Sequence, residues 1–246
     1  MIALCLFIVS FVAWFFSMLA GGGSPFILIP LISVLLGVQA VAPIITTGLL
    51  IGNAQRSLFF WSEINWRVTA WYLPGATVGA VLGCYGLTQV HTEGLQLVLG
   101  VGLLAMVGNY VMGSQNTQFQ VKAWHFLPLS LINAIGSGLM GSTGPVMNPL
   151  YLGYGLEKEA MVATKALNKV SLHVVKLLAY AALGSLSYQY LTYGLVIGLA
   201  AIPANWLGKW VLAQMSAQQF RQLVFTFVAV SGVIMIWQQR SLLLLF

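Results

Sequence analysis

Four basic side chains share one face of a strongly apolar stretch in the second half of the chain. The stretch follows a glycine-rich break at 141–145, and it carries Lys165, Asn168, Lys169, His173 and Lys176. At about 100° per residue of an α-helix, the basic positions lie at roughly 0°, 40°, 80° and 20°, with no acidic residue on that face. Cations in an apolar span usually face a bundle interior or a water-filled cavity. The spacing therefore predicts a path for a small anion.

The position of each basic residue along this helix indicates whether it can bind substrate or instead reach the membrane interface. Lys165 lies about two turns from the loop with Glu159, and Lys176 lies near the far end, so either amine could instead reach the membrane interface. Asn168 can hydrogen-bond a ligand or a neighbouring helix. Lys169 and His173 lie deeper, and we expect these two to be the main charged ligands.

Two glycine-rich breaks, at 21–25 and 141–145, each lead into a proline, which suits the first turn of a helix because it needs no N–H donor. Ser24 and Gly144 are the expected N-caps. Unpaired N–H groups at a helix start attract anions. We therefore predict that the two tips bind substrate through Gly22, Gly23, Ser24, Ser142, Thr143 and Gly144. The alternative is that the glycines only permit close packing or a kink.

The first half carries a weaker polar face. Thr46, Asn53 and Arg56 share one side of the segment 40–61 and complete the predicted substrate-binding set. The offset that pairs Thr47 with Thr164 places Arg56 opposite His173. Arg56 could otherwise anchor its helix at the interface, where aromatic and basic side chains gather.

The composition requires a membrane environment. The chain is 59% hydrophobic and only 6% charged, with a mean hydropathy of +0.92, far from the averages of soluble domains. Long apolar runs without period-2 alternation predict an all-α polytopic membrane protein in contact with the lipid bilayer. Residues 1–20 lack a basic n-region, so we expect them to stay in the mature protein. The net charge of +6 is scattered, which excludes a nucleic-acid partner.

The sequence lacks the residues that other chemistry needs. It has no Asp, and its four acidic residues, all Glu, fall in loops or at segment ends, which disfavours a carboxylate proton relay or sodium site. No P-loop or metal-ligand spacing is present. Cys5 and Cys84 lie far apart in apolar segments and are expected to be packing residues. We expect no enzymatic activity, no cofactor and no bound metal.

The apolar segments indicate a duplicated chain. They cover 2–20, 25–36, 40–61, 66–88, 94–113, 124–140, 145–154, 159–183, 188–213 and 217–239. The segments 25–36 and 145–154 are too short to cross about 30 Å of hydrocarbon. Matching residues are Pro25 with Pro145, Pro30 with Pro149, Ala42 with Ala160, Thr47 with Thr164, Pro74 with Pro203 and Gly79 with Gly208. We expect one membrane domain, 1–246, with repeat one at about 1–113, a linker at 114–123 and repeat two at about 124–246.

The short segments allow two topologies. If each broken pair forms one discontinuous span, the halves run parallel. If each pair is a re-entrant hairpin, each half holds the hairpin plus three spans, and the odd number inverts the second half. The positive-inside bias favours the inverted arrangement, because it places Arg56, Arg67, Lys122, Lys158, Lys209 and Arg221 towards the cytoplasm. Met1 and Phe246 are then periplasmic.

The chain resembles the TauE/SafE family of sulfite and organosulfur-anion exporters. The resemblance rests on the glycine tip at 21–25 with Pro30 and Gly37, on Thr46 and Thr47, and on the run 74–83. It covers nearly the whole chain, although the second tip departs from a full glycine run and Lys165 to Lys169 replaces smaller residues. It implies a bacterial inner-membrane transporter of a small anion such as sulfite or a sulfonate. The extra lysines suggest a ligand with more than one negative charge.

These observations together predict a secondary carrier, most simply an exporter, whose site lies at the repeat interface near the midplane. With a negative cell interior, expelling one negative charge gains about 2.3 kcal/mol per 100 mV, so export needs no coupled ion. A passive anion channel is the alternative, because the same basic lining would serve it. The sequence leaves a homo-oligomer open.

Overall fold

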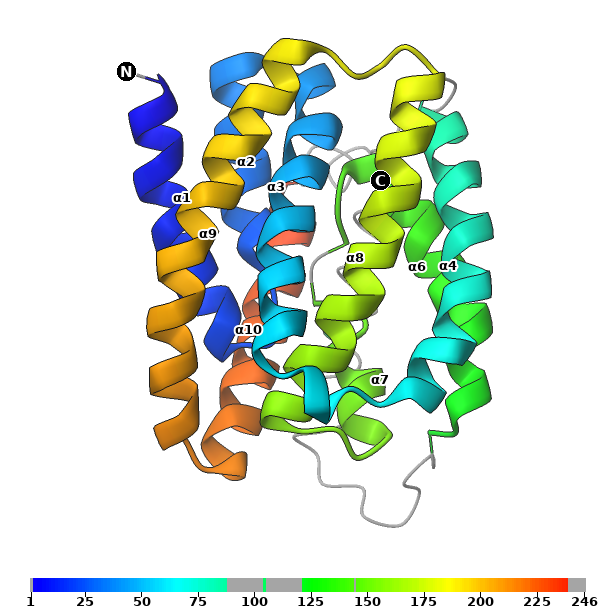
Figure 1. The fold of residues 1–246 in the computed structure, drawn as a ribbon, viewed down its shortest axis with the longest axis vertical. Coiled ribbons are helices and arrows are strands. Elements are labelled where there is room, and N and C mark those ends of the chain that lie inside the picture. Colours follow the sequence, from blue (N-terminus) through cyan, green and yellow to red (C-terminus); the bar gives the residue numbers. More distant parts are fainter. Residues whose placement is uncertain (1, 88–103, 105–120, 144, 239–246) are drawn as a thin grey trace.

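The computed structural model describes residues 2–87, 104, 121–143 and 145–238, and its elements are helices (Figure 1). They are α1 (Ile2–Leu19), α2 (Ser24–Leu36), α3 (Val38–Phe59), α4 (Trp66–Leu87), α6 (Phe126–Met140), α7 (Asn148–Gly153), α8 (Lys158–Ala182), α9 (Tyr188–Gln214) and α10 (Ala217–Gln238), with short 3-10 turns η1 (Trp61–Glu63) and η3 (Ala123–His125). No strand occurs in these ranges. The all-α prediction is confirmed. The segment predicted at 94–113 and most of the linker 114–123 lie outside the described residues.

Helix boundaries agree with the predicted segments within a few residues, except at the second glycine tip. There the segment was predicted to start at Pro145, but α7 begins at Asn148. The N–H of Asn148 donates to the carbonyl of Pro145, three residues earlier, at 2.8 Å. This bond closes a turn rather than an α-helical repeat, so Pro145 is not the first residue of a helix.

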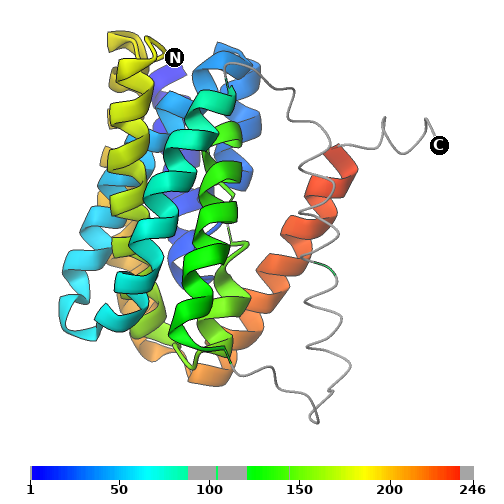
Figure 2. The ribbon, with the colours of Figure 1, turned by 90° about the vertical axis from the view of Figure 1, so that its right-hand side faces the viewer.

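The chain runs between two ends of a bundle, which we call the N-terminal end, where α1 begins, and the η1 end, where α3 turns into α4. In Figure 1, α1 descends from the N-terminal end and α2 runs back towards it. In the second half α6 rises from the η1 end, and the chain then returns to α7 at that same end. The helices α3, α4, α8 and α9 run between the two ends, and α10 leans away from the bundle in Figure 2.

The two halves use the same helix pairing. Helix α4 packs mainly against α6, α9 packs against both α1 and α3, and α3 and α8 meet between these pairs. Glycines allow this close approach: a side chain added at Gly138 would begin 2.5 Å from the carbonyl carbon of Gly83. Small residues at such contacts let backbones approach and gain packing energy in a lipid environment.

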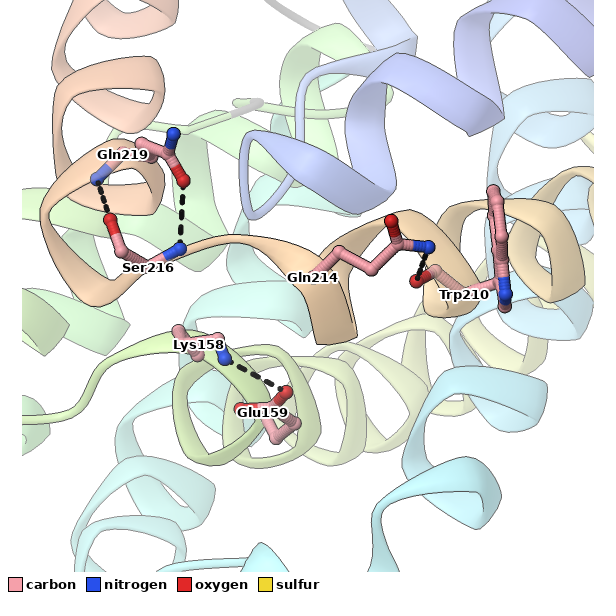
Figure 3. A network of polar contacts seen from close by, with 6 residues as sticks. All are labelled: Lys158, Glu159, Trp210, Gln214, Ser216 and Gln219. Carbon is pink, nitrogen blue, oxygen red and sulfur yellow. Dashed lines mark hydrogen bonds and ion pairs between the residues drawn. The ribbon is translucent and has the colours of Figure 1, made fainter.

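A capping box fixes the turn into α10 at the η1 end. The N–H of Gln219 donates to Ser216 Oγ at 3.2 Å, and the N–H of Ser216 donates to Gln219 Oε1 at 2.8 Å (Figure 3). The reciprocal pair satisfies two N–H groups that the first helical turn leaves without partners. At the start of α8, Lys158 pairs with Glu159 at 3.5 Å.

Polarity is distributed in the opposite sense to that of a soluble protein. Large apolar side chains such as Val34, Leu58, Ile132, Leu178 and Leu199 are exposed on the outer surface. Arg56, Lys165, Lys169, His173 and Lys176 are all at most 6% exposed. Two of the described helices, α1 and α9, are long and apolar enough to cross a membrane. An apolar exterior around buried cations suits a protein whose surface contacts lipid.

Candidate functional site

A cavity of about 30 Å³ lies inside the bundle, where the first glycine tip approaches α3 and α8. Its lining consists of Trp14, Ser17, Gly22, Gly23, Ser24, Pro25, Leu49, Asn53, Arg56, Ser142, Lys165, Lys169 and His173. This volume suffices for a water molecule or an ion of few atoms. None of these described lining residues is acidic, so the cations around the cavity have no carboxylate to neutralise them.

The structure brings most of the predicted binding residues to this cavity. Gly22, Gly23, Ser24, Asn53, Arg56, Ser142, Lys165, Lys169 and His173 all line it. These residues lie on α2, α3, α8 and both glycine tips, more than 140 positions apart at the extremes. The agreement arises because glycine tips and basic stripes are local signals, and helix packing brings both to the bundle interior.

Three predicted residues lie elsewhere, and Gly144 lies outside the described residues. Thr143 donates from Oγ1 to Asn133 Oδ1 at 2.6 Å, and Asn168 donates from Nδ2 to the hydroxyl of Tyr151 at 2.9 Å. Thr46 is buried but does not line the cavity. For Asn168 the neighbouring-helix alternative is the observed one.

The cavity also contains residues that the sequence did not single out, namely Trp14, Ser17, Pro25 and Leu49. Trp14 is fully buried, and its indole Nε1 has no hydrogen-bond partner in the described part of the chain. Trp14 and Ser17 lie three residues apart on α1, the spacing that puts two side chains on one helix face. That spacing was the available signal, but an aromatic residue in a membrane helix does not by itself indicate a binding site.

The first glycine tip reverses the chain through three consecutive left-handed residues. Gly21, Gly22 and Gly23 have φ of 64°, 132° and 119°, which glycine adopts at little cost. Ser24 was predicted as the N-cap, but Gly23 occupies that position and Ser24 is the first helical residue. The N–H of Gly22 donates to the Ser17 carbonyl at 2.7 Å. The N–H groups of Gly23 and Ser24, at the start of α2, are our candidates for binding an anion.

The second tip does not provide the predicted helix start. Helix α7 has only six residues and begins with Met147 as its N-cap, so the helix start expected at Pro145 is wrong. The physical reason is the turn at 145–147, which separates the glycine break from the helix. Ser142 is the tip residue that reaches the cavity lining.

Lys165 and Lys176, the outer members of the basic stripe, both bind backbone carbonyls at or just beyond the end of a helix. Lys165 donates to the Gly21 carbonyl at 2.5 Å and to Asn148 Oδ1. Lys176 donates to the carbonyls of Ser137 at 2.8 Å and Gly141 at 2.6 Å. Because both amines are buried and bonded inside the bundle, the interfacial alternative for these two residues is wrong.

Lys169 and His173, the inner members, have no such partners. In the described part of the chain, neither Lys169 Nζ nor either ring nitrogen of His173 has a hydrogen-bond partner, although both side chains are buried. Burying an unpaired ammonium costs far more free energy than burying one that is hydrogen-bonded. Both residues line the cavity, so a bound anion would supply the missing interaction.

The guanidinium of Arg56 is hydrogen-bonded to other groups of the protein. Its Nε donates to Asn205 Oδ1 at 2.8 Å, and its two terminal nitrogens donate to Ser17 Oγ at 3.2 Å and to the Trp14 carbonyl at 3.0 Å. The guanidinium also lies 4.6 Å from the centre of the Trp14 ring. Arg56 therefore links α3 to α1 and α9 inside the bundle, and the alternative of an interfacial anchor is wrong.

We expect Arg56→Lys to lower stability while leaving anion affinity within about threefold of the parent. Lysine keeps the positive charge beside the cavity, but one ammonium cannot reproduce the planar fork that reaches three acceptors. Buried acceptors left unsatisfied should lower the free energy of unfolding by about 1–2 kcal/mol. Thermal denaturation in detergent, with and without anion, measures both quantities. A large loss of affinity with unchanged stability would make Arg56 a ligand instead.

A family model described as the sulfite exporter TauE/SafE matches residues 6–235. The match includes every residue that lines the cavity. Comparisons with curated proteins and with solved structures found no match.

Proposed function

Because the chain belongs to the sulfite exporter TauE/SafE family, we propose that it carries a small sulfur oxyanion out of the cell through the cavity between α3 and α8. Membership implies a membrane transporter of sulfite or organosulfur anions, and it supports the expectation that the chain is not an enzyme. The observation that carries our proposal is the pair Lys169 and His173, whose nitrogens are buried at the cavity without partners. The proposal concerns the site, the size of the ion and the direction of transport.

An anion in the cavity would meet donors on several sides. Lys169 would supply a charge-assisted hydrogen bond, which is shorter and stronger than a neutral one. A neutral His173 imidazole offers one N–H donor, and Trp14 Nε1 offers another. The N–H groups of Gly23 and Ser24 lie at the start of α2, where the helix dipole favours negative charge. These donors would replace the water that the anion loses on entry.

The field at the cavity is strongly positive. Arg56, Lys165 and Lys169 line it without an acidic neighbour among the described residues. Charges in a low-dielectric interior act more strongly than in water, so the empty site is electrostatically unfavourable and binding of an anion relieves it. This arrangement favours an ion that carries more than one negative charge.

The size of the cavity favours a compact ion. A volume of about 30 Å³ admits an ion of few atoms, whereas a sulfonate with an organic tail would require the site to widen. With a negative interior, outward movement of each negative charge gains about 2.3 kcal/mol per 100 mV. The potential alone would therefore drive export.

Helix geometry supports the inverted arrangement of two repeats as part of this proposal. The pairs α1–α2 and α6–α7 each start and finish at one end of the bundle, and these ends are opposite (Figure 1). Each pair would be a re-entrant hairpin, with the N-terminal end on the periplasmic side. The cavity then lies near the membrane midplane, where carriers with inverted repeats bind their substrates.

Sulfite and thiosulfate should raise the apparent melting temperature of the purified protein, because a ligand that binds only the folded state stabilises it. At a concentration 100 times the dissociation constant, the gain is about 2.7 kcal/mol. Sulfonates and carboxylates test the size limit, and chloride at equal ionic strength is the control. Stabilisation by chloride alone, or by none of the sulfur anions, would overturn the proposed site. Counterflow in proteoliposomes then distinguishes a carrier from a channel.

A further inference from the structure

We propose that Lys165 and Lys176 are the two gates of the transport path, each holding the chain at the end of one broken helix. Lys165 lines the cavity, and Lys176 lies beyond the cavity residue His173 on α8. This inference rests on the proposed function, because gates have meaning only for a transported ion. It assigns to the outer lysines a role different from the binding role of Lys169. The two lysines lie eleven positions apart, roughly 16 Å along α8, with Lys169 and His173 between them.

Lys165 joins both broken helices on the side of the cavity towards the η1 end. Gly21 lies two residues beyond the end of α1, and Lys165 donates to its carbonyl at 2.5 Å. It also donates to Asn148 at the start of α7. Asn148 in turn donates from Nδ2 to the Ala20 carbonyl at 3.2 Å. A closed ring of hydrogen bonds thus connects α8, the first tip and α7.

Apolar side chains continue this closure towards the η1 end. Met161 lies one turn before Lys165 on α8, and its methyl carbon is 3.1 Å from where a side chain at Gly21 would begin. Phe220 of α10 approaches the same point at 3.7 Å. Both Met161 and Phe220 are fully buried. Under this proposal, an ion in the cavity would reach the η1 end only after the contacts of Lys165 open.

Lys176 makes the corresponding closure on the opposite side of His173. It donates to the Ser137 carbonyl, to Ser137 Oγ at 3.2 Å and to the Gly141 carbonyl, which together cover the end of α6. One turn further, Tyr180 donates from its hydroxyl to the Gly138 carbonyl at 2.8 Å. Lys176 and Tyr180 are fully buried, so the second broken helix is held at its end as the first one is.

These contacts are suited to opening, because their partners are neutral. Carbonyl oxygens compensate a buried ammonium less well than an anion does. Lysine carries its charge on a flexible stem, so either ammonium can leave its carbonyls and follow the ion. The released helix end is then free to move. Alternating access follows if one lysine releases while the other stays bound, and both are bound in this structure.

Sided labelling of a cysteine in the cavity tests the gates. Leu49 lines the cavity, so Leu49→Cys in a Cys5→Ser, Cys84→Ala background reports access. A membrane-impermeant thiol reagent is applied from each face of oriented proteoliposomes. We expect slow labelling of the parent from both faces. Lys165→Met should accelerate labelling at least tenfold from the η1 end only, and Lys176→Met from the N-terminal end only.

Matched variants separate gating from misfolding. Asn148→Ala removes a partner of Lys165 and leaves the lysine, so it should open the η1 end as Lys165→Met does. Lys165→Arg keeps a cation that can bind the carbonyls and should restore slow labelling. Folding of each variant is checked by monodisperse elution, and Asn148→Ala decides the result if Lys165→Met fails to fold. Unchanged labelling, or equal acceleration from both faces, would contradict the proposal that Lys165 and Lys176 are gates.

The outcome is independent of the cargo, because labelling needs no substrate. If labelling accelerates from one face only and no sulfur anion stabilises the protein, the gating role of the two lysines is supported and the proposed identity of the transported ion is wrong. Stabilisation by sulfite without one-sided opening would uphold the binding site, and it would reduce Lys165 and Lys176 to fixed supports of the helix ends.

Discussion

Lys169→Gln should weaken binding of sulfite or thiosulfate by about 1.5–3 kcal/mol, the range for hydrogen bonds to a charged group, or roughly 10- to 150-fold in dissociation constant. Lys169 is buried, its ammonium has no partner in the described part of the chain, and it lines a cavity without a described acidic neighbour. Glutamine keeps the approximate length and a donor but removes the charge. Isothermal titration calorimetry in detergent measures the change.

The same substitution should leave the empty protein as stable as the parent, or more stable, because an uncompensated buried charge is removed. The control is Lys209→Gln. Lys209 lies 4.8 Å from the Phe59 ring and is not among the cavity residues, so its loss should change affinity less than twofold. If Lys169→Gln binds as tightly as the parent, Lys169 is not the ligand.

Gly22→Val should abolish measurable anion binding and lower the free energy of unfolding by about 1–3 kcal/mol, the cost of forcing a side chain into a disfavoured backbone region. Gly22 has a φ of 132°. A side chain there would begin 2.5 Å from Lys165 Nζ, and would displace the lysine and fill the space beside the tip. Denaturation and titration of the same preparation measure the two effects.

Gly155→Val provides the matched control for backbone strain. Gly155 also has a positive φ, 94°, but nothing lies within 4 Å of the position where its side chain would begin. The Gly155→Val variant should lose about as much stability as Gly22→Val does, but it should keep the affinity of the parent for the anion. Equal losses of affinity in both variants would show that Gly22→Val acts through general destabilisation. The glycines of the first tip would then serve packing rather than anion binding.

Helix positions were predictable because their signals are local. Glycine and proline punctuate the apolar segments, and segment length distinguishes a full span from a short element. The start of α7 was the exception: Pro145 indicated a first helical turn, yet the chain makes a separate turn there and starts the helix at Asn148. Ser24 was misassigned by one position for a related reason, since the capping geometry depends on backbone angles at Gly23 that composition does not reveal.

The sequence by itself determined that this protein is an all-helical membrane protein with a cationic face on α8. The helical period of about 3.6 residues puts Lys165, Lys169, His173 and Lys176 on one side whatever surrounds them, and the family match extends over 6–235. Only the tertiary structure decided what each cation does. Lys165 meets the carbonyl of Gly21, 144 positions earlier, and no local pattern encodes such a contact. Because a buried ammonium takes whichever acceptor packing supplies, helix packing alone separates the two bonded lysines from the unpartnered pair between them.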